Sequence, residues 1–369
     1  MRLGIYARGL SGKGGVHEAI HTITEVIIKF IKPTDELFIV HNVGNIYFEG
    51  TPDNVHEIFM TSNNKFVCDY IQAPRILNNL NLDAIWFPKN VIPFFIKARK
   101  VVTVHDLAYY LPEYNAYEFV DTLYMKTMIR SSCKRADKIT TISQLSKNDI
   151  VEILDIPSEK VEITFWGAAD IYKAMTNLAN IDANKLQKVK ERYQLPEKFI
   201  LYTGDITPRK NLARLIKAFN QIEDENLYLV MTGIKNYKTP EANALINKSN
   251  RVKQIGYIDR DEMPYLYRLA YLYAYPSLYE GMGRPVLEAH ACGCPVVASG
   301  TSAIPEIGGN AVCYIKDPLN VENIKQQLLK VLNDENYRQD LIAKGYENEK
   351  QFSCDISGMQ ILNLLKGKL

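Results

Sequence analysis

Two glutamates on either side of a glycine-rich turn are the residues of this sequence best suited to hold a charged ligand. Glu280 precedes the turn, Gly281 and Gly283 lie in it, and Glu288 follows it. Pro285 predicts the start of a helix, because the N–H that proline lacks has no partner in the first helical turn. Backbone N–H groups at a glycine turn and a helix start bind anions. We therefore expect a phosphorylated ligand with hydroxyl-rich parts on both sides, such as a nucleotide sugar.

Two adjacent cations, Arg209 and Lys210, form a second candidate for anion binding. They follow a predicted strand and a turn that begins at Gly204, and they precede a predicted helix. The positive end of a helix is an unfavourable place for cations. An anion bound between them would remove this repulsion, and guanidinium and ammonium groups are both phosphate ligands. The alternative is a solvated basic turn, but the glycine turn at 281–283 favours phosphate binding.

A histidine and a glycine-rich segment are the candidates in the first half of the chain. His105 stands beside Asp106 at the end of a predicted strand, where it could hydrogen-bond a substrate or take a proton. The alternative, a buried histidine with satisfied hydrogen bonds, is the better interpretation of this residue alone. The segment 9–15 lacks the Lys-Ser/Thr ending of a P-loop and is not G-x-G-x-x-G. It permits a close approach of backbone to ligand.

A zinc site is the alternative that we weigh and do not favour. His17, Glu18 and His21 match the H-E-x-x-H pattern of zinc peptidases. They follow a glycine-rich turn at the start of an α/β pattern, so we expect them to line a cleft or face solvent. The cysteines show no metal-ligand spacing and are expected to be reduced thiols: Cys68, Cys133, Cys292, Cys294, Cys313 and Cys354.

Composition is that of a soluble globular protein. The net charge of +2 gives no indication of nucleic-acid binding. We find no signal peptide and no apolar run near the roughly 20 residues of a membrane span, so we expect a cytoplasmic protein. Residues 89–100 mix apolar and basic side chains and could touch the inner membrane face, although packing beside the next strand is the interpretation we favour.

Strand-like runs alternate with helical patterns in two series, which predicts two parallel sheets. The first series has predicted strands at 3–7, 37–41, 84–87, 101–105 and 138–142, and the second at 199–203, 227–232, 252–255, 272–275 and 296–298. We expect two Rossmann-like doubly wound domains that face a central cleft, with ligands at the carboxyl ends of the strands. The predicted parts are 1–170, an acceptor-binding domain; 171–198, a linker; 199–350, a nucleotide-sugar-binding domain; and 351–369, a helix that packs back on the first domain.

Taken together, these residues resemble glycosyltransferase family four, retaining enzymes of the GT-B fold. The resemblance is strong over residues 200–316 and moderate at His105-Asp106. It is loose at the N-terminal glycine loop. In the strong part it includes Gly204, 208–211, the Gly256-Tyr257 turn, 276–281, Glu288-Ala289 and Pro305-Glu306.

The resemblance implies a role for each candidate. The residues implied to act on the donor sugar or its diphosphate are His105, Arg209, Lys210 and Glu280. The residues implied to complete the donor site are Gly204, Tyr257, Gly281, Met282, Gly283 and Glu288, with Glu288 on the ribose and the Tyr257 region on the base. Gly14 and Gly15 would line the acceptor side. The family needs no metal, so we expect no metal and no cofactor.

Three residues depart from the family pattern. Arg284 stands where an apolar residue is usual, and it would add charge near the phosphates or form a surface salt bridge. His290 replaces a usual Met, and Cys354 replaces a usual Trp near the chain end.

The resemblance implies transfer of a hexose from a nucleotide sugar to a glycan or lipid-linked acceptor. We expect mannose from GDP-mannose, because residues 105–113 resemble those of mannosyltransferase-like members. The alternatives are a UDP-sugar-dependent glucosyl- or N-acetylhexosaminyltransferase and a sugar-nucleotide-binding partner without catalysis.

Overall fold

The chain folds into two compact units. The computed structural model describes all residues except 9, 11–13, 43–46, 115–116, 177–180, 234–238 and 369. The N-terminal unit comprises Met1–Tyr110, Glu118–Trp166 and Ser353–Leu369, and the C-terminal unit comprises Leu111–Tyr117 and Gly167–Phe352. The predicted linker thus lies in the C-terminal unit, where it forms two helices and a 3-10 turn.

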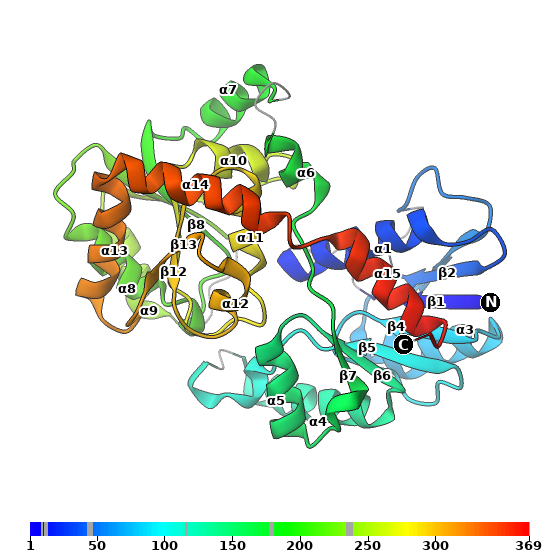
Figure 1. The fold of residues 1–369 in the computed structure, drawn as a ribbon. Helices are drawn as coiled ribbons and strands as arrows, with labels where there is room; N and C mark the ends of the chain where they lie inside the picture. Colours follow the sequence, from blue (N-terminus) through cyan, green and yellow to red (C-terminus); the bar gives the residue numbers. More distant parts are fainter. Residues whose placement is uncertain are drawn as a thin grey trace. The chain divides into compact units, whose positions relative to one another are not determined.

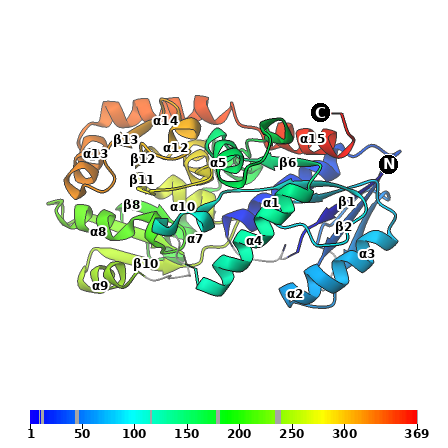
Figure 2. The same cartoon turned by 90° about the horizontal axis from the view of Figure 1, so that it is seen from below.

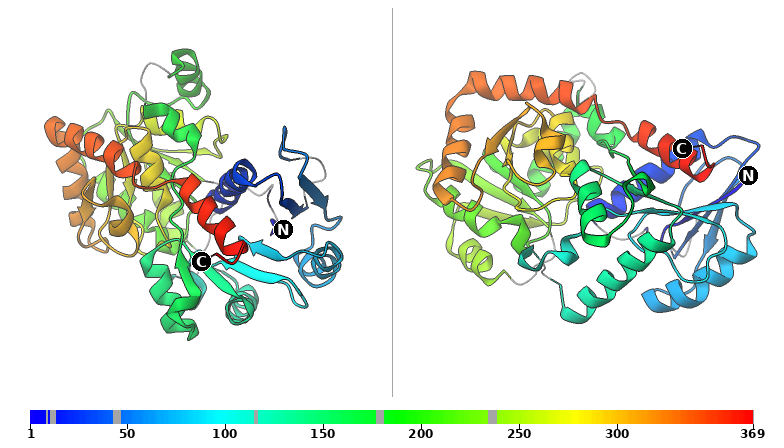
Figure 3. Two further views of the ribbon diagram at one scale, coloured as in Figure 1. Left: turned by 45° about the vertical axis from the view of Figure 1, so that its right-hand side comes forward. Right: turned by 60° about the horizontal axis from the view of Figure 1, so that its bottom comes forward.

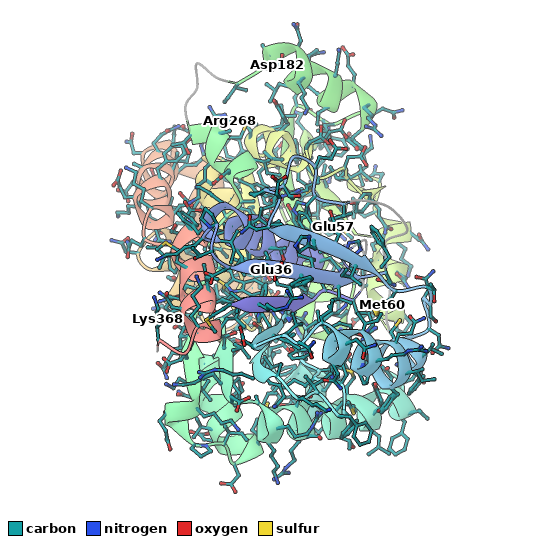
Figure 4. All side chains as sticks on the ribbon, turned by 90° about the vertical axis from the view of Figure 1, so that its right-hand side faces the viewer. Glu36, Glu57, Met60, Asp182, Arg268 and Lys368 are labelled. Carbon is teal, nitrogen blue, oxygen red and sulfur yellow. The ribbon has the colours of Figure 1, made fainter. Side chains whose placement is uncertain are left out.

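The N-terminal unit is built on a seven-stranded parallel sheet of order β3-β2-β1-β4-β5-β6-β7. Figure 4 labels Glu36 on β2 and Glu57 on β3 of this sheet. The strands are β1 (Arg2–Tyr6), β2 (Glu36–His41), β3 (Val55–Phe59), β4 (Ala84–Phe87), β5 (Arg99–Thr103), β6 (Lys138–Thr141) and β7 (Val161–Ile163). The helices are α1 (Gly15–Phe30), α2 (Lys65–Val67), the π-helix η1 (Cys68–Gln72), α3 (Ala73–Asn79), α4 (Phe119–Arg135), α5 (Gln144–Leu154) and α15 (Cys354–Leu365).

The C-terminal unit is built on a six-stranded parallel sheet of order β10-β9-β8-β11-β12-β13. The strands are β8 (Lys198–Thr203), β9 (Leu227–Thr232), β10 (Val252–Gly256), β11 (Leu272–Tyr275), β12 (Val296–Ser299) and β13 (Val312–Ile315). The helices are α6 (Asp170–Lys173), α7 (Ala183–Arg192), α8 (Leu212–Asn220), α9 (Pro240–Lys248), α10 (Met263–Leu269), α11 (Arg284–Ala291), α12 (Ile304–Gly308), α13 (Val321–Asn333) and α14 (Glu335–Glu349). Figure 3 shows α13 and α14 as the orange and orange-red helices beside this sheet.

The last helix of the chain, α15, packs against α1 in the N-terminal unit (Figure 1). A Cβ atom on Gly358 would lie 2.3 Å from Val26 Cγ1, so only glycine allows this close approach. Two ion pairs hold the ends of α15: Lys29 with Asp355 at 2.8 Å and Lys366 with Asp35 at 2.6 Å.

The predicted fold class, two doubly wound parallel sheets, is confirmed. The strands that the sequence did not predict are β3, β7 and β13, and all three are edge strands. No helix among the described residues is both long and apolar enough to cross a bilayer.

Candidate active site

Arg209, Lys210 and Glu280 form one buried ion cluster in the C-terminal unit. Arg209 Nη1 lies 2.8 Å from Glu280 Oε2, and Lys210 Nζ lies 2.7 Å from Glu280 Oε1. The three side chains are between 9 and 20% exposed. The structure thus brings the predicted phosphate ligands together with the predicted sugar ligand. The carboxylate of Asp205, in the turn after β8, also acts electrostatically on Lys210.

A turn after β8, at which the backbone favours glycine, positions the two cations. Gly204 has a φ of 118°, which a residue with a side chain rarely adopts. The Lys210 side chain lies beside this turn, with its Cε 3.6 Å from where a Cβ at Gly204 would be. The cations then lie in a 3-10 turn, Pro208–Lys210, ahead of α8.

The loop that carries Glu280 is tied to this turn. Leu278 N donates to the carbonyl of Arg209 at 2.7 Å, and Arg209 Nη1 donates to the carbonyl of Tyr279 at 2.9 Å. Asn211, with a φ of 58°, donates through Nδ2 to the carbonyl of Pro318 at 2.6 Å. These hydrogen bonds hold the turn of the two cations against the loop of Glu280. None of the three involves the ammonium of Lys210.

The charges in the cluster stabilise one another. Burial would raise the pKa of the Glu280 carboxyl, but the charges of Arg209 and Lys210 outweigh this effect and hold the pKa at about 2. Burial lowers the pKa of the Lys210 ammonium, and the Glu280 carboxylate opposes that shift. Removing one partner would leave a buried charge uncompensated, which is costly.

The glycine turn leads into α11 as the sequence predicts. Gly283 caps the helix with a φ of 91°, and Pro285 lies in its first turn. The helix ends at Ala291, two residues before Gly293, whose φ is 66°. The first N–H groups of a helix have no intrahelical partner. Together with the helix dipole they favour an anion at this end of α11.

Ser302 and Tyr275 complete the site, and the sequence did not predict either. Ser302 Oγ accepts from Glu280 N at 2.9 Å and donates to Glu280 O at 2.8 Å, so it fixes the backbone ahead of the turn. The Tyr275 hydroxyl accepts from Lys210 Nζ at 2.9 Å, and a Cβ on Gly283 would lie 3.7 Å from its ring. Tyr275 therefore connects Lys210 with the start of α11. Neither residue belongs to a motif, so no sequence signal marked them.

Glu288 lies one turn into α11 with both carboxylate oxygens engaged. Oε1 lies 3.2 Å from Arg284 Nε, and Oε2 accepts from the Tyr267 hydroxyl at 3.2 Å. Arg284 is itself buried, so the expected surface salt bridge is wrong. The i,i+4 spacing on the helix brings the pair together. Binding of ribose hydroxyls by Glu288 stays a prediction.

Met282 and Tyr257 are the other residues predicted to bind the donor. Met282 is buried within the turn, and its predicted backbone contact to the diphosphate stays a prediction. Tyr257 follows Gly256, whose φ is 74°, and its side chain is exposed. An exposed aromatic ring after a strand can stack on a base, which is the role predicted for this region.

His105 belongs to the N-terminal unit, two residues beyond the end of β5, and it is buried. Its Nε2 lies 2.8 Å from the carbonyl of Pro88, which can only accept, so Nε2 carries the proton. Burial lowers the pKa of the imidazole, so the ring is neutral and Nδ1 keeps its lone pair. The structure thus shows a buried, hydrogen-bonded histidine. Its predicted contact with the donor sugar stays a prediction.

Gly14 and Gly15 begin α1, and Gly14 has a φ of 112°. A Cβ at either position would meet no atom of the described residues within 4 Å. Most of the preceding glycine-rich segment lies outside the described residues, and the acceptor-side role stays a prediction.

The two histidines of the zinc pattern have different partners. His17 Nε2 lies 3.2 Å from the Lys89 ammonium, and His21 Nδ1 lies 3.0 Å from Glu25 Oε2. A neighbouring ammonium disfavours a bound cation. Within the described ranges no group of three or more His, Cys, Asp or Glu side chains could hold a metal ion.

The remaining departures from the family pattern are structural. His290 packs against Gly345 in the core, and burial lowers the pKa of its imidazole to about 4. Cys354 is buried at the start of α15.

Comparison with known proteins agrees with the fold. Residues 184–348 match the family described as glycosyl transferases group 1. The O-antigen chain mannosyltransferase B of Escherichia coli is 31% identical over 276 residues, which are 73% of this chain and 70% of that protein. The serotype-specific mannosyltransferase WbdA of Escherichia coli is 27% identical over 277 residues, which are 69% of this chain but only 32% of WbdA.

A similar solved structure is that of Anabaena HepE in complex with UDP-glucose. It has a TM-score of 0.76 and 16% identity, and the match covers 100% of both chains. The fold and the site define a glycosyltransferase of the GT-B fold. The chain belongs to the group 1 glycosyltransferase family, as the resemblance to family four predicted.

Proposed function

We propose that the protein transfers mannose from GDP-mannose to a glycan or lipid-linked acceptor, with retention of the anomeric configuration and without a metal ion. The observation that carries this proposal is the buried cluster in which Arg209 and Lys210 share the carboxylate of Glu280. Relatives named as mannosyltransferases support the sugar.

The cluster suits a leaving nucleoside diphosphate. When the bond between the anomeric carbon and the phosphate oxygen breaks, negative charge grows on the diphosphate. Fixed cations and N–H dipoles that face this charge stabilise the transition state more than the ground state. Arg209, Lys210 and the start of α11 supply these groups from rigid elements.

The electrostatics of Glu280 support same-face attack. A carboxyl with a pKa of about 2 is a weak base and a weak nucleophile, because two cations already stabilise its negative charge. We assign Glu280 to binding sugar hydroxyls, not to a covalent intermediate. The departing phosphate oxygen would take the acceptor proton, and the acceptor would attack the face that the leaving group vacates.

The same cations support a mechanism without a metal ion. Divalent ions in sugar transfer neutralise the leaving diphosphate, and here Arg209 and Lys210 could fill that role. A UDP-sugar is the alternative donor, because the diphosphate ligands do not distinguish the bases. A binding partner without catalysis is the alternative from another class of protein.

A donor panel in EDTA tests these alternatives. Purified protein would be incubated with GDP-mannose, UDP-glucose and UDP-N-acetylhexosamines, and release of nucleoside diphosphate measured with and without an oligosaccharide acceptor. We expect GDP release from GDP-mannose that EDTA does not change, and NMR of the product should show the donor's anomeric configuration. Loss of turnover in EDTA would contradict the metal-free mechanism. Nucleotide binding without turnover of any donor would favour the non-catalytic partner.

A further inference from the structure

The N-terminal unit exposes large apolar side chains where a folded surface usually carries polar ones. Phe95, Phe119 and Val120 are 82%, 79% and 78% exposed. Other exposed apolar side chains come from α2, η1 and α4: Phe66, Tyr70, Ile71 and Leu123. Single exposed apolar residues are ordinary, but a contiguous group of them marks an interaction surface.

Ring contacts show that these side chains form one surface. Phe95 packs beside Phe94 at 6.3 Å between ring centroids, and Phe94 stacks on Tyr70 at 5.9 Å. Phe66 lies 6.2 Å from Tyr70 and 5.3 Å from Tyr124, which follows Leu123 in α4. The surface therefore runs from the loop after β4 across α2 and η1 to the start of α4, and Figure 2 shows α2 and α4 beside one another.

Polar contacts hold the same segments in place. Arg135 of α4 donates to the carbonyls of Ile92 and Pro93, and its guanidinium lies 4.2 Å from the centroid of the Phe94 ring. Asn78 of α3 donates to the carbonyl of Phe95 at 2.8 Å. The exposed rings thus extend from a rigid frame.

The charge of this surface is strongly positive. The segments 65–79, 89–100 and 119–135 contain ten Lys or Arg residues and two Asp or Glu residues, whereas the whole chain has a net charge of only +2. The exposed cations among them are Arg75, Lys97, Arg130 and Lys134, and the exposed Glu118 adds one acid beside Phe119. One of the two acids, Asp69, is buried, and the other, Asp121, is paired with Lys65 at 2.8 Å. On α4 the exposed positions change from apolar, Val120 and Leu123, to basic, Arg130 and Lys134.

We propose that this surface docks the protein on an anionic lipid bilayer. Exposed aromatic and aliphatic side chains insert at the boundary of headgroups and acyl chains, while Lys and Arg attract anionic headgroups. A second copy of this chain is disfavoured as the occupant, because a self-pairing contact would face one positive surface with another.

The structure also refines the sequence-based interpretation of residues 89–100. Packing beside the next strand holds for Val91, Ile92 and Ile96, which are buried. The side chain of Phe95 does not take part in that packing, because it is exposed. The backbone of Phe95 has a φ of 63°, in the left-handed region. The membrane interpretation therefore applies to the loop tip, as part of a larger surface.

Vesicle sedimentation of the full chain tests the proposal. We expect partitioning onto vesicles of equal parts phosphatidylglycerol and phosphatidylcholine, none onto phosphatidylcholine alone, and weakening by salt. The double variant Phe95→Ser, Phe119→Ser should lower the partition coefficient about tenfold or more, because two large apolar contacts are lost. Leu123→Ser should weaken binding, whereas Leu319→Ser should not. Leu123 and Leu319 are matched in type and exposure, 56% and 57%, and Leu319 lies in the C-terminal unit.

Three results would overturn the proposal: no partitioning onto anionic vesicles, equal partitioning of the wild type and the double variant, or a concentration-dependent dimer that Leu123→Ser abolishes. Calorimetric binding of GDP keeps this test separate from the proposed function. The surface variants should bind GDP like the wild type. If neither the wild type nor any variant binds GDP, the proposed function is contradicted, but the proposal of membrane docking is not.

Discussion

The carboxylate of Glu280 lies 2.7 Å from the ammonium of Lys210, and both side chains are largely buried. In the absence of a ligand, Glu280 therefore compensates a cation that the proposed reaction needs for the diphosphate. A diphosphate that enters this site brings its own negative charge, so Glu280 becomes able to accept hydrogen bonds from sugar hydroxyls. The relationship gives one residue two roles, and each can be measured.

Replacing Glu280 by Gln should destabilise the ligand-free protein. The variant removes the carboxylate that pairs with both cations, and breaking such a cluster costs about 3 kcal/mol of the free energy of unfolding. Because a bound nucleoside diphosphate supplies the missing charge, GDP should raise the Tm of Glu280→Gln more than that of the wild type. Denaturant unfolding and thermal scans with and without GDP measure both effects.

The matched control for this variant is Glu241→Gln. Glu241 pairs with Lys217 on the exposed face of the same unit, where ion pairs contribute about 0–1 kcal/mol. A Glu280→Gln protein as stable as this control would show that the buried cations need no compensation.

The pH dependence of stability should reveal the same carboxylate. The folded pKa of Glu280 is about 2, below its ordinary value of 4.5, so its contribution is present above pH 4.5 and is lost as the pH falls towards 2. The shift corresponds to about 3 kcal/mol. The difference in free energy of unfolding between wild type and Glu280→Gln should therefore shrink across this window. Parallel stability curves down to pH 2 would show that the carboxyl is not stabilised by the cations.

Replacing Lys210 by Ala should impair turnover more than folding. Loss of one group that stabilises a developing charge typically lowers kcat by about 100-fold or more. The control Lys217→Ala removes a lysine of α8 that pairs only at the surface, and we expect normal kcat. Steady-state kinetics and circular dichroism on both variants decide the matter. A folded Lys210→Ala enzyme with near-normal turnover would remove Lys210 from the leaving-group site.

Replacing Gly358 by Ala should loosen the docking of α15 on α1. The new methyl group would lie 2.3 Å from Val26 Cγ1, and overpacking of this kind costs about 1–3 kcal/mol. Gly15→Ala is the control, since a Cβ there meets nothing within 4 Å. Chemical denaturation should show a clear loss for Gly358→Ala and little change for Gly15→Ala. Equal stabilities would mean that the helices do not pack this closely.

Much of this architecture could be predicted, because buried parallel strands carry continuous apolar runs. The unpredicted strands β3, β7 and β13 lie at sheet edges, and β3 has only one buried residue, Val55. β7 likewise has only one buried residue, Val161, and such strands carry a weak apolar signal. The apolar strand β13 was missed without such a reason. The predicted strand 101–105 was wrong at both ends, since β5 runs from Arg99 to Thr103 and begins with two cations.

The site residues that lie in the two turns could be predicted from the sequence. The residues that other elements contribute could not. Gly204, Gly283 and the two cations stand out because positive φ angles and charges at a helix start have few explanations. The contact between Tyr275 and Lys210 joins residues 65 positions apart, which no local pattern encodes. The buried state of His105, by contrast, is the interpretation that the sequence favoured for this residue alone.

The most direct test of the central claim is a crystal structure of the protein with GDP. The account predicts the β-phosphate within hydrogen-bonding distance of Arg209 and Lys210 and beside the backbone N–H of Gly283. A nucleotide bound elsewhere, with both cations still paired to Glu280 and no phosphate at the start of α11, would contradict it.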